Sequence, residues 1–410
     1  MPIYLLATCD TKGHEIEFVR DRLTTIGLAA RIIDTGCVGE PQIEPDVTRA
    51  EVFHAAGTTL ETMQKQGDRG AAVTRAAVGA RVIVERLHAS GEVDGVLGVG
   101  GSAGTTIGTA VMRALPLGLP KVMVSTLASG QVRQFVGDKD IWMLNSVVDI
   151  LGLNRISRTV LSRAAEAMAG MVRFALEPIA AADRPLVAAT MFGVTTPCVA
   201  RAKERLEQAG CEVLVFHATG TGGQAMESLV REGLIAGVLD LTTTELADEV
   251  VGGVLSAGPG RLTAAGGQGV PQVVSVGATD MVNFHGMDTV PGAFRDRNLY
   301  RHNENVTLMR TTAEECRRIG EDLGRKIAAG KGQRVILLPA RGVSAIDKEG
   351  QPFDDLAART ALFEAVRRTA GDVEVIEIDR HINDSEFATA AAEKLIELMT
   401  SAQVESVTGG

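Results

Sequence analysis

Short apolar runs alternate with segments of helical periodicity from one end of the chain to the other. Residues 3–8 form a mostly apolar run that predicts a buried strand, and an apolar stripe in residues 16–26 predicts the helix that follows it. After a loop over residues 36–48, the stripe in residues 73–87 predicts a long helix. Short apolar strands separated by helices are typical of a parallel sheet covered on both faces, so the pattern predicts an α/β fold.

Residues 177–185 interrupt this alternation, because they contain two prolines and no periodicity. The same pattern then restarts and continues almost to the end of the chain. We therefore predict two tandem doubly wound, Rossmann-like α/β domains with mostly parallel sheets, over residues 1–180 and residues 184–405. Ligands of such sheets bind at the carboxyl ends of the strands, and we expect a substrate in the cleft between the domains.

The composition excludes several classes of protein. The chain has 51 acidic and 41 basic residues, a net charge of −10 and no basic run, which argues against a sequence-independent nucleic-acid binder. No stretch of about 18 apolar residues is present, so we predict no membrane helix. The five cysteines form no CxxC pair, and residues 1–6 lack the basic segment of a signal peptide. We therefore expect a cytoplasmic protein.

The densest glycine cluster spans residues 98–108 and lies between a predicted strand and a predicted helix. Its backbone N–H groups would converge where the helix dipole is positive, which predicts a site for a nucleotide phosphate. It lacks the Lys of a Walker A loop, and no acidic residue ends the next strand as in NAD-dependent enzymes. A tight strand-to-helix turn would have the same glycines. The candidate ligands here are Gly100, Gly101, Ser102, Gly104, Thr105 and Thr106.

Three other predicted strand ends place polar residues at the same edge of the sheet. Lys12 could neutralise a phosphate, and Asp10 and Asp149 could hold Mg²⁺, although Asp10 could equally be a helix cap. The candidates from these three segments are Asp10, Thr11, Lys12, Gly13, Ser129, Gly130, Ser146 and Asp149. Four polar strand ends together indicate a nucleotide site more strongly than any single loop.

The second half of the chain contains candidates for chemistry on a small anionic substrate. The predicted catalytic residues are His302, His381, Asp240, Glu245 and Arg341, with Arg301 as a further contact. A histidine near carboxylates can act as a general base or a metal ligand, whereas a lone histidine more often has a structural role. Residues 219–223 form a second possible anion cradle. No HExxH, GxSxG or HxH spacing is present, so the motifs identify no reaction.

Several ordered segments resemble one known family over nearly the whole chain. In the N-terminal half they are residues 7–13, 98–108 and 146–154. In the C-terminal half they are residues 238–245, 280–284, 302–303, 307–312 and 381–384. The family is the uncharacterised bacterial group related to the ATP-binding inhibitory domain of the plant tobamovirus-resistance protein. The resemblance implies two α/β domains, ATP binding and self-association, while His285 and Glu304 depart from the family's pattern.

Three hypotheses for the function remain open. In the first, an enzyme uses ATP and Mg²⁺ for phosphoryl transfer to a small anionic substrate or for activation of its carboxylate. In the second, a metal-dependent lyase or hydrolase acts on a small oxo-acid. In the third, the chain is a nucleotide-responsive binding module without catalysis. In each case we expect a homodimer or larger assembly and no nucleic-acid or membrane partner.

Overall fold

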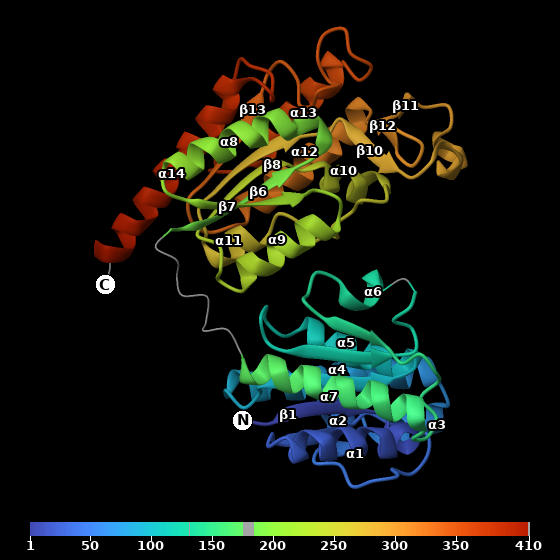
Figure 1. Cartoon of the computed structure of the whole chain (residues 1–410). Helices are drawn as coiled ribbons and strands as arrows, with labels where there is room; N and C mark the ends of the chain where they lie inside the picture. Colours follow the sequence, from blue (N-terminus) through green and yellow to red (C-terminus); the bar gives the residue numbers. More distant parts are fainter. Residues whose placement is uncertain (131, 175–183, 409–410) are drawn as a thin grey trace. The chain divides into compact units, whose positions relative to one another are not determined.

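The computed structural model describes residues 1–130, 132–174 and 184–408 (Figure 1). The chain divides into two compact units, Met1–Pro178 and Ile179–Gly410. Within the predicted linker, residues 177–183 lie outside the described residues. Each unit has its own sheet and its own buried apolar clusters.

The first unit is a five-stranded parallel sheet with helices on both faces (Figure 1). Its strand order, β2-β1-β3-β4-β5, is a doubly wound order, so the predicted α/β class is confirmed for this unit. Its elements are β1 (Ile3–Ala7), α1 (Cys9–Thr25), β2 (Ala30–Asp34), α2 (Arg49–Ala55), α3 (Leu60–Gln66), α4 (Arg69–Ala89), β3 (Gly95–Gly100), α5 (Ser102–Arg113), β4 (Lys121–Ser125), α6 (Arg133–Val136), β5 (Trp142–Asn145) and α7 (Arg155–Arg173).

The two faces of this sheet have separate cores. Tyr4 on β1 packs with α2, α4 and α5, whereas its neighbour Leu5 packs with α1 and α7 on the other face. This alternation follows from the two-residue period of a strand. Because both faces are covered, all five residues of β1 are buried, and this explains the uninterrupted apolar run in the sequence.

The prediction of one long helix directly after the loop over residues 36–48 is wrong, because three helices follow that loop. A capping box between Thr48 and Glu51 starts α2. Gly57 and Gly67 have φ values of 72° and 64°, a conformation that favours glycine and ends a helix. The predicted stripe in residues 73–87 lies entirely within the third helix, α4.

The second unit contains a six-stranded parallel sheet with the order β14-β13-β9-β8-β6-β7. A three-stranded antiparallel sheet, β10-β12-β11, accompanies it. The elements are β6 (Leu186–Met191), η1 (Gly193–Thr195), α8 (Thr196–Gln208), β7 (Glu212–His217), α9 (Thr221–Arg231), β8 (Gly237–Thr242), α10 (Thr244–Val251), α11 (Ala264–Gln268), β9 (Gln272–Gly277), β10 (Met281–Phe284), η2 (Met287–Thr289), η3 (Gly292–Phe294), β11 (Leu299–Arg301), β12 (Thr307–Arg310), α12 (Ala313–Ala328), β13 (Arg334–Pro339), α13 (Leu356–Thr369), β14 (Glu374–Ile378) and α14 (Ser385–Thr408).

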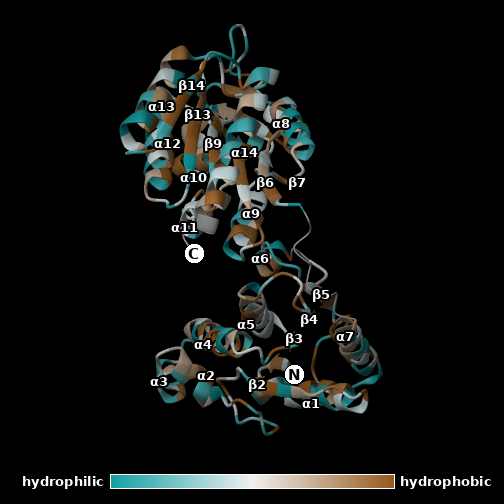
Figure 2. Cartoon of the chain, turned by 90° about the vertical axis from the view of Figure 1, so that its left-hand side faces the viewer, coloured by the Kyte–Doolittle hydropathy of each residue, from teal (hydrophilic) through white to brown (hydrophobic). Residues whose placement is uncertain are grey.

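The helices of both units are amphipathic and pack against the sheets with their apolar sides. Figure 2 shows apolar colour concentrated on the strands and mixed colours along the surrounding helices. In α12, for example, Cys316, Ile319 and Leu323 are buried at helical spacing. In the described ranges, no helix is both long enough and apolar enough to cross a membrane.

Candidate functional site

A cavity of about 220 Å³ opens at the carboxyl edge of the first unit's sheet. It lies where β1 and β3 end, two strands that are neighbours in the sheet although β2 separates them in the sequence. The winding of the chain reverses at this junction, and doubly wound sheets bind their ligands at such a point. The predicted nucleotide-site residues that line the cavity are Asp10, Thr11, Lys12, Gly101, Ser102, Gly104 and Asp149.

The N-terminus of α5 faces this cavity. Gly101 is the N-cap residue, and no side chain of the described residues accepts a hydrogen bond from the first turn of the helix. The backbone N–H groups of Ser102, Ala103 and Gly104 are therefore free of a capping side chain, at the positive end of a 12-residue helix. This is the arrangement that binds phosphate groups.

The two central glycines of the loop have different structural roles. A Cβ atom on Gly100 would lie 2.7 Å from the Cα atom of Gly104, so close packing of the turn requires glycine there. A Cβ atom on Gly101 would have Thr126 Oγ1 as its nearest neighbour, at 3.7 Å, and the φ of Gly101 is −82°. The fold itself therefore accepts a side chain at residue 101.

Two cations line the cavity without an ionic partner. Lys12 interrupts α1 with non-helical φ and ψ values of −130° and 19°. Arg69 is the first residue of α4, and sequence analysis missed it because it follows a helix cap and no strand end. Among the described residues, neither the Lys12 ammonium nor the Arg69 guanidinium forms an ion pair or a side-chain hydrogen bond. The cavity therefore presents two cations that have no direct partner among the described residues, beside the carboxylates of Asp10 and Asp149.

Two carboxylates complete the lining. Asp10 Oδ2 accepts hydrogen bonds from the Val38 and Gly39 N–H groups, at 2.9 and 3.2 Å, while Oδ1 has no hydrogen-bond partner among the described residues. Asp149 Oδ1 accepts from its own neighbour, the Ile150 N–H, at 2.8 Å. No group of three or more His, Cys, Asp or Glu side chains in the described ranges could hold a metal ion. These two aspartates could thus supply only part of a Mg²⁺ coordination shell, with phosphate oxygens and water as the other ligands.

Other residues predicted for this site do not line the cavity. Thr105 is buried, and its hydroxyl is 2.6 Å from Ser125 Oγ. Thr106 Oγ1 donates to Ser102 O within α5, and Ser146 Oγ donates to Val148 O. The residues with no place in the lining are Gly13, Gly100, Thr105, Thr106, Ser129, Gly130 and Ser146.

In the second unit, Asp240 and Glu245 belong to a buried cluster around Arg261. The Arg261 side chain is fully buried, and it contacts Asp240 at 2.5 Å and Glu245 at 2.6 Å. Glu245 Oε1 also accepts from the N–H groups of Gly220 and Gly223, at 2.7 and 3.1 Å. The second predicted anion cradle, at the N-terminus of α9, therefore already holds a carboxylate of the chain itself. Burial raises the pKa of Glu245, and Arg261 opposes that shift.

The other catalytic candidates also have structural partners or lie apart from them. His381 is buried, with Nδ1 accepting from the Asn383 N–H and Nε2 donating to Ser344 O at 2.8 Å. This pattern fixes the neutral ring, and burial lowers the pKa of His381. Arg341 forms an exposed ion pair with Asp379, while His302 lies in the exposed loop after β11. The described contacts do not bring these residues together into one site.

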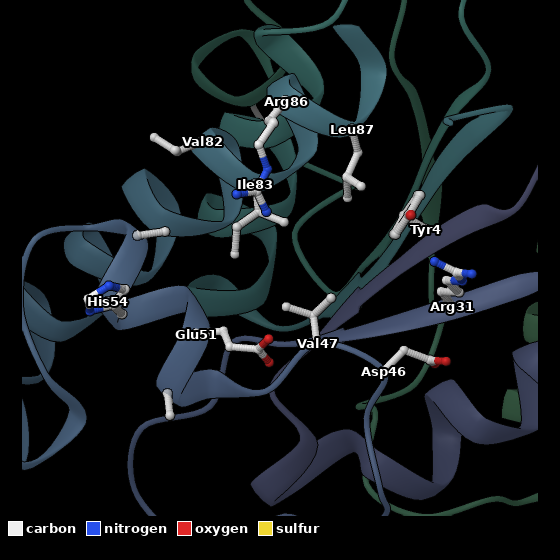
Figure 3. Close-up of a pocket in the computed structure, with 12 residues that line it drawn as sticks. Tyr4, Arg31, Asp46, Val47, Glu51, His54, Val82, Ile83, Arg86 and Leu87 are labelled. Atoms are coloured by element: carbon white, nitrogen blue, oxygen red, sulfur yellow. The ribbon is translucent and has the colours of Figure 1, made fainter. Parts of the chain in front are cut away.

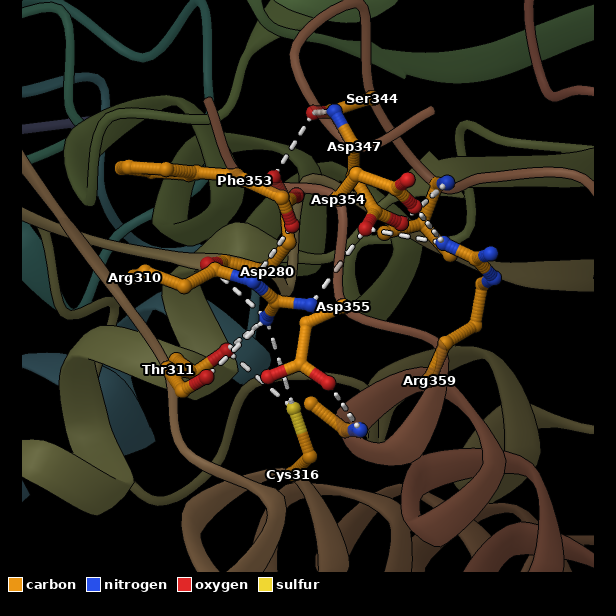
Figure 4. Close-up of polar contacts among 12 residues, drawn as sticks. Asp280, Arg310, Thr311, Cys316, Ser344, Asp347, Phe353, Asp354, Asp355 and Arg359 are labelled. Atoms are coloured by element: carbon orange, nitrogen blue, oxygen red, sulfur yellow. Dashed lines mark hydrogen bonds and ion pairs between the residues drawn. The ribbon is translucent and has the colours of Figure 1, made fainter. Parts of the chain in front are cut away.

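A second buried charge cluster, which sequence analysis missed, surrounds Arg310 (Figure 4). Arg310 donates to Phe353 O at 2.7 Å and lies 3.4 Å from Asp347 Oδ1. Ser344 Oγ donates to Asp280 Oδ2 at 2.8 Å, while Asp280 Oδ1 is buried without a partner among the described atoms. Burial and the charge of Asp347 raise the pKa of Asp280 to about 7. These contacts fix the small antiparallel sheet to the loop that follows β13.

Two domain profiles of one family, the uncharacterised protein family UPF0261, match residues 1–177 (N-terminal domain) and 184–399 (C-terminal domain). A UPF0261 protein of Clostridium tetani is 51% identical over 97% of this chain and 98% of its own length. One of Rhizobium meliloti is 48% identical over 95% of this chain and 97% of its own. The ToMV resistance protein Tm-1 of Solanum lycopersicum is 38% identical over 97% of this chain and 55% of its own length. Among solved structures, the glycosyltransferase SnogD from Streptomyces nogalater aligns over 97% of this chain and 99% of its own length. The sequence identity is 13% and the TM-score is 0.18.

Proposed function

The chain belongs to the UPF0261 family, as its segments predicted, and we propose that its first unit binds ATP at the carboxyl edge of the β1 and β3 strands. The observation that carries this proposal is the convergence of three positive groups on one cavity. They are the uncapped N-terminus of α5, the Lys12 ammonium and the Arg69 guanidinium. Phosphates would replace the missing cap and neutralise both cations.

The size of the cavity limits which part of the nucleotide it would hold. Its volume of about 220 Å³ is below the roughly 300 Å³ at which typical small-molecule pockets begin. We therefore assign only the phosphate groups to the cavity and place the adenosine outside it. Affinity should then depend on the number of phosphates more than on the base.

The residues present fit Mg²⁺, which Asp10 and Asp149 would hold. Asp10 offers its free Oδ1, and Asp149 lies in the same lining. A hard cation with several water and phosphate ligands needs only one or two such carboxylates. The metal would neutralise the repulsion between these two aspartates and the nucleotide.

The contacts of the second unit bear on how the protein would use ATP. An ATP-dependent enzyme acting on a small anionic substrate needs free polar groups, whereas Asp240, Glu245 and His381 are engaged in internal contacts. That observation favours another candidate function, the nucleotide-responsive binding module without catalysis. Loss of ATP during incubation with the purified protein and a panel of metabolites would favour the enzyme, and its persistence would favour the module.

Titration calorimetry with ATP, ADP, inorganic tripolyphosphate and adenosine tests the nucleotide site. We expect tripolyphosphate to retain most of the ATP affinity and adenosine to lose at least tenfold, about 1.4 kcal/mol. Omitting Mg²⁺ should weaken ATP more than adenosine. Equal affinities for ATP and adenosine would refute a site built around phosphates.

A further inference from the structure

A larger groove, of about 770 Å³, lies on one face of the first unit at the edge strand of its sheet (Figure 3). Its floor is formed by Tyr4 of β1 and Arg31 of β2, which are paired in register and lie on the same face. Its walls come from α2 and α4, with Ile83 and Leu87 as apolar lining. The volume is within the roughly 300–1,000 Å³ range of small-molecule pockets.

This groove is at the opposite end of the strands from the proposed nucleotide site. Tyr4 is the second residue of β1, whereas Thr8, which lines the smaller cavity, follows the end of that strand. The two positions are four residue steps apart along the chain, roughly 13 Å at about 3.3 Å per step. The two linings share no residue.

The charged side chains of the groove differ in whether they have hydrogen-bond or ion-pair partners. Asp46 accepts a hydrogen bond from the Ile32 N–H, and Glu51 accepts from Thr48 in the capping box of α2. Both carboxylates therefore have local partners. In the described part of the chain, by contrast, Arg31 and Arg86 form no hydrogen bond or ion pair through their guanidinium groups. The groove thus has two free cations on either side of an apolar lining.

Tyr4 provides an independent sign of a ligand. Its side chain is 1% exposed and lines the groove, and its hydroxyl is buried without a partner among the described atoms. A buried hydroxyl without a hydrogen bond costs about 1–3 kcal/mol, so it usually has a partner in a native protein. A ligand oxygen at the floor of the groove would supply the missing acceptor.

We propose that this groove binds a small organic anion with an apolar body, such as a carboxylate, sulfonate or phosphate on an aromatic or branched frame. The anionic group would pair with Arg31 or Arg86 at one side of the groove, and the apolar body would cover Ile83 and Leu87. A guanidinium group recognises planar carboxylates and phosphates by paired hydrogen bonds, so an arginine free of other partners suits such an anion. This site is independent of the proposed ATP site.

The test uses 8-anilinonaphthalene-1-sulfonate, an aromatic sulfonate whose fluorescence rises in an apolar site, with the full chain and saturating ATP. We expect one saturable site per chain, and a loss of at least tenfold in affinity when Arg31→Ala and Arg86→Ala are combined. Tyr4→Phe should weaken the probe about fivefold without lowering the melting temperature, because the Tyr4 hydroxyl has no partner among the described atoms of the free protein.

The matched control is Arg81→Ala, which removes an arginine of the same helix, α4, that pairs with Glu85 and lies outside the groove. It should leave the probe affinity unchanged. Equal affinity in wild type and the double arginine variant would overturn the proposal. Displacement of the probe by ATP would also overturn it. A double arginine variant that changes only the sedimentation of the protein would overturn it as well, because a second copy of the chain would then cover the groove.

Discussion

At the scale of single residues, the presence or absence of a partner separates binding candidates from structural ones. Lys12 and Arg69 line a cavity and form no ion pair within the described ranges, whereas Arg341 is paired with Asp379. His381 has both ring nitrogens engaged. A side chain whose donors are already used contributes little to a new ligand, so the two free cations are the ones to mutate.

Replacing Lys12 or Arg69 with alanine should weaken ATP binding and leave adenosine binding nearly unchanged, because only the phosphates interact with the cations. We expect a loss of about tenfold for each variant, and a smaller salt dependence of the ATP affinity. Calorimetric titration at two ionic strengths measures both effects. Arg81→Ala, on the same helix as Arg69, serves as the control, and an equal loss in that variant would contradict the assignment.

At the scale of elements, buried carboxylates join helices and strands that are distant in the sequence. Glu245 on α10 caps the N-terminus of α9 and pairs with Arg261. Asp248, one turn later, accepts from the Asn283 N–H at 3.0 Å and so connects α10 to β10. The position of α10 therefore depends on polar contacts as well as on its apolar side.

Glu245→Ala should destabilise the second unit by about 3 kcal/mol, because it leaves the buried Arg261 with fewer compensating charges and uncaps α9. Urea unfolding followed by circular dichroism measures the change. Glu249→Ala, at an exposed position of the same helix, should cost less than about 0.5 kcal/mol. A similarly small cost for Glu245→Ala would mean that the contacts of Glu245 with Arg261 and the N-terminus of α9 contribute little to stability.

The stability of the second unit should fall as the pH rises from about 4 to 7. Burial raises the pKa of Asp248 from 3.8 to about 7. As the pH rises, the Asp248 carboxyl ionises in the unfolded chain before it ionises in the folded one. The stability that is present below the unfolded-state pKa is therefore lost as the pH rises through the folded-state pKa. Asp248→Asn should flatten this part of the curve, because an amide does not titrate. Asn283 Nδ2 donates to Asp248 Oδ2 in the structure, so the Asn283 amide must turn over for its Oδ1, which has no partner among the described atoms, to accept from the new amide. An unchanged slope in urea unfolding between pH 5 and 7.5 would argue against this prediction.

At the scale of the whole molecule, the sequence predicts what is local and periodic and misses what depends on distant contacts. The buried run in β1 and the stripe of α4 follow directly from burial on a covered sheet. The antiparallel sheet was missed because strands of three or four residues have no measurable period. Arg261 was missed because its partners come from other segments, and no pattern in the sequence joins them.

We also expect the whole chain to self-associate, as its resemblance to the family implies. Analytical ultracentrifugation at micromolar concentration should show a dimer or a larger assembly, and its dependence on protein concentration gives the affinity. The double variant Arg31→Ala, Arg86→Ala should sediment like wild type, because we assign the groove to a small anion. A strict monomer at these concentrations would contradict self-association.

Gly101→Val tests whether phosphates lie against the first turn of α5, because residue 101 is the N-cap of that helix. The fold has space for a side chain at residue 101, but that side chain would project into the cavity lining. Calorimetric titration of ATP into wild type and this variant should show a loss of at least tenfold, about 1.4 kcal/mol, with an unchanged melting temperature in the absence of nucleotide. Wild-type ATP affinity in a folded Gly101→Val protein would contradict the account.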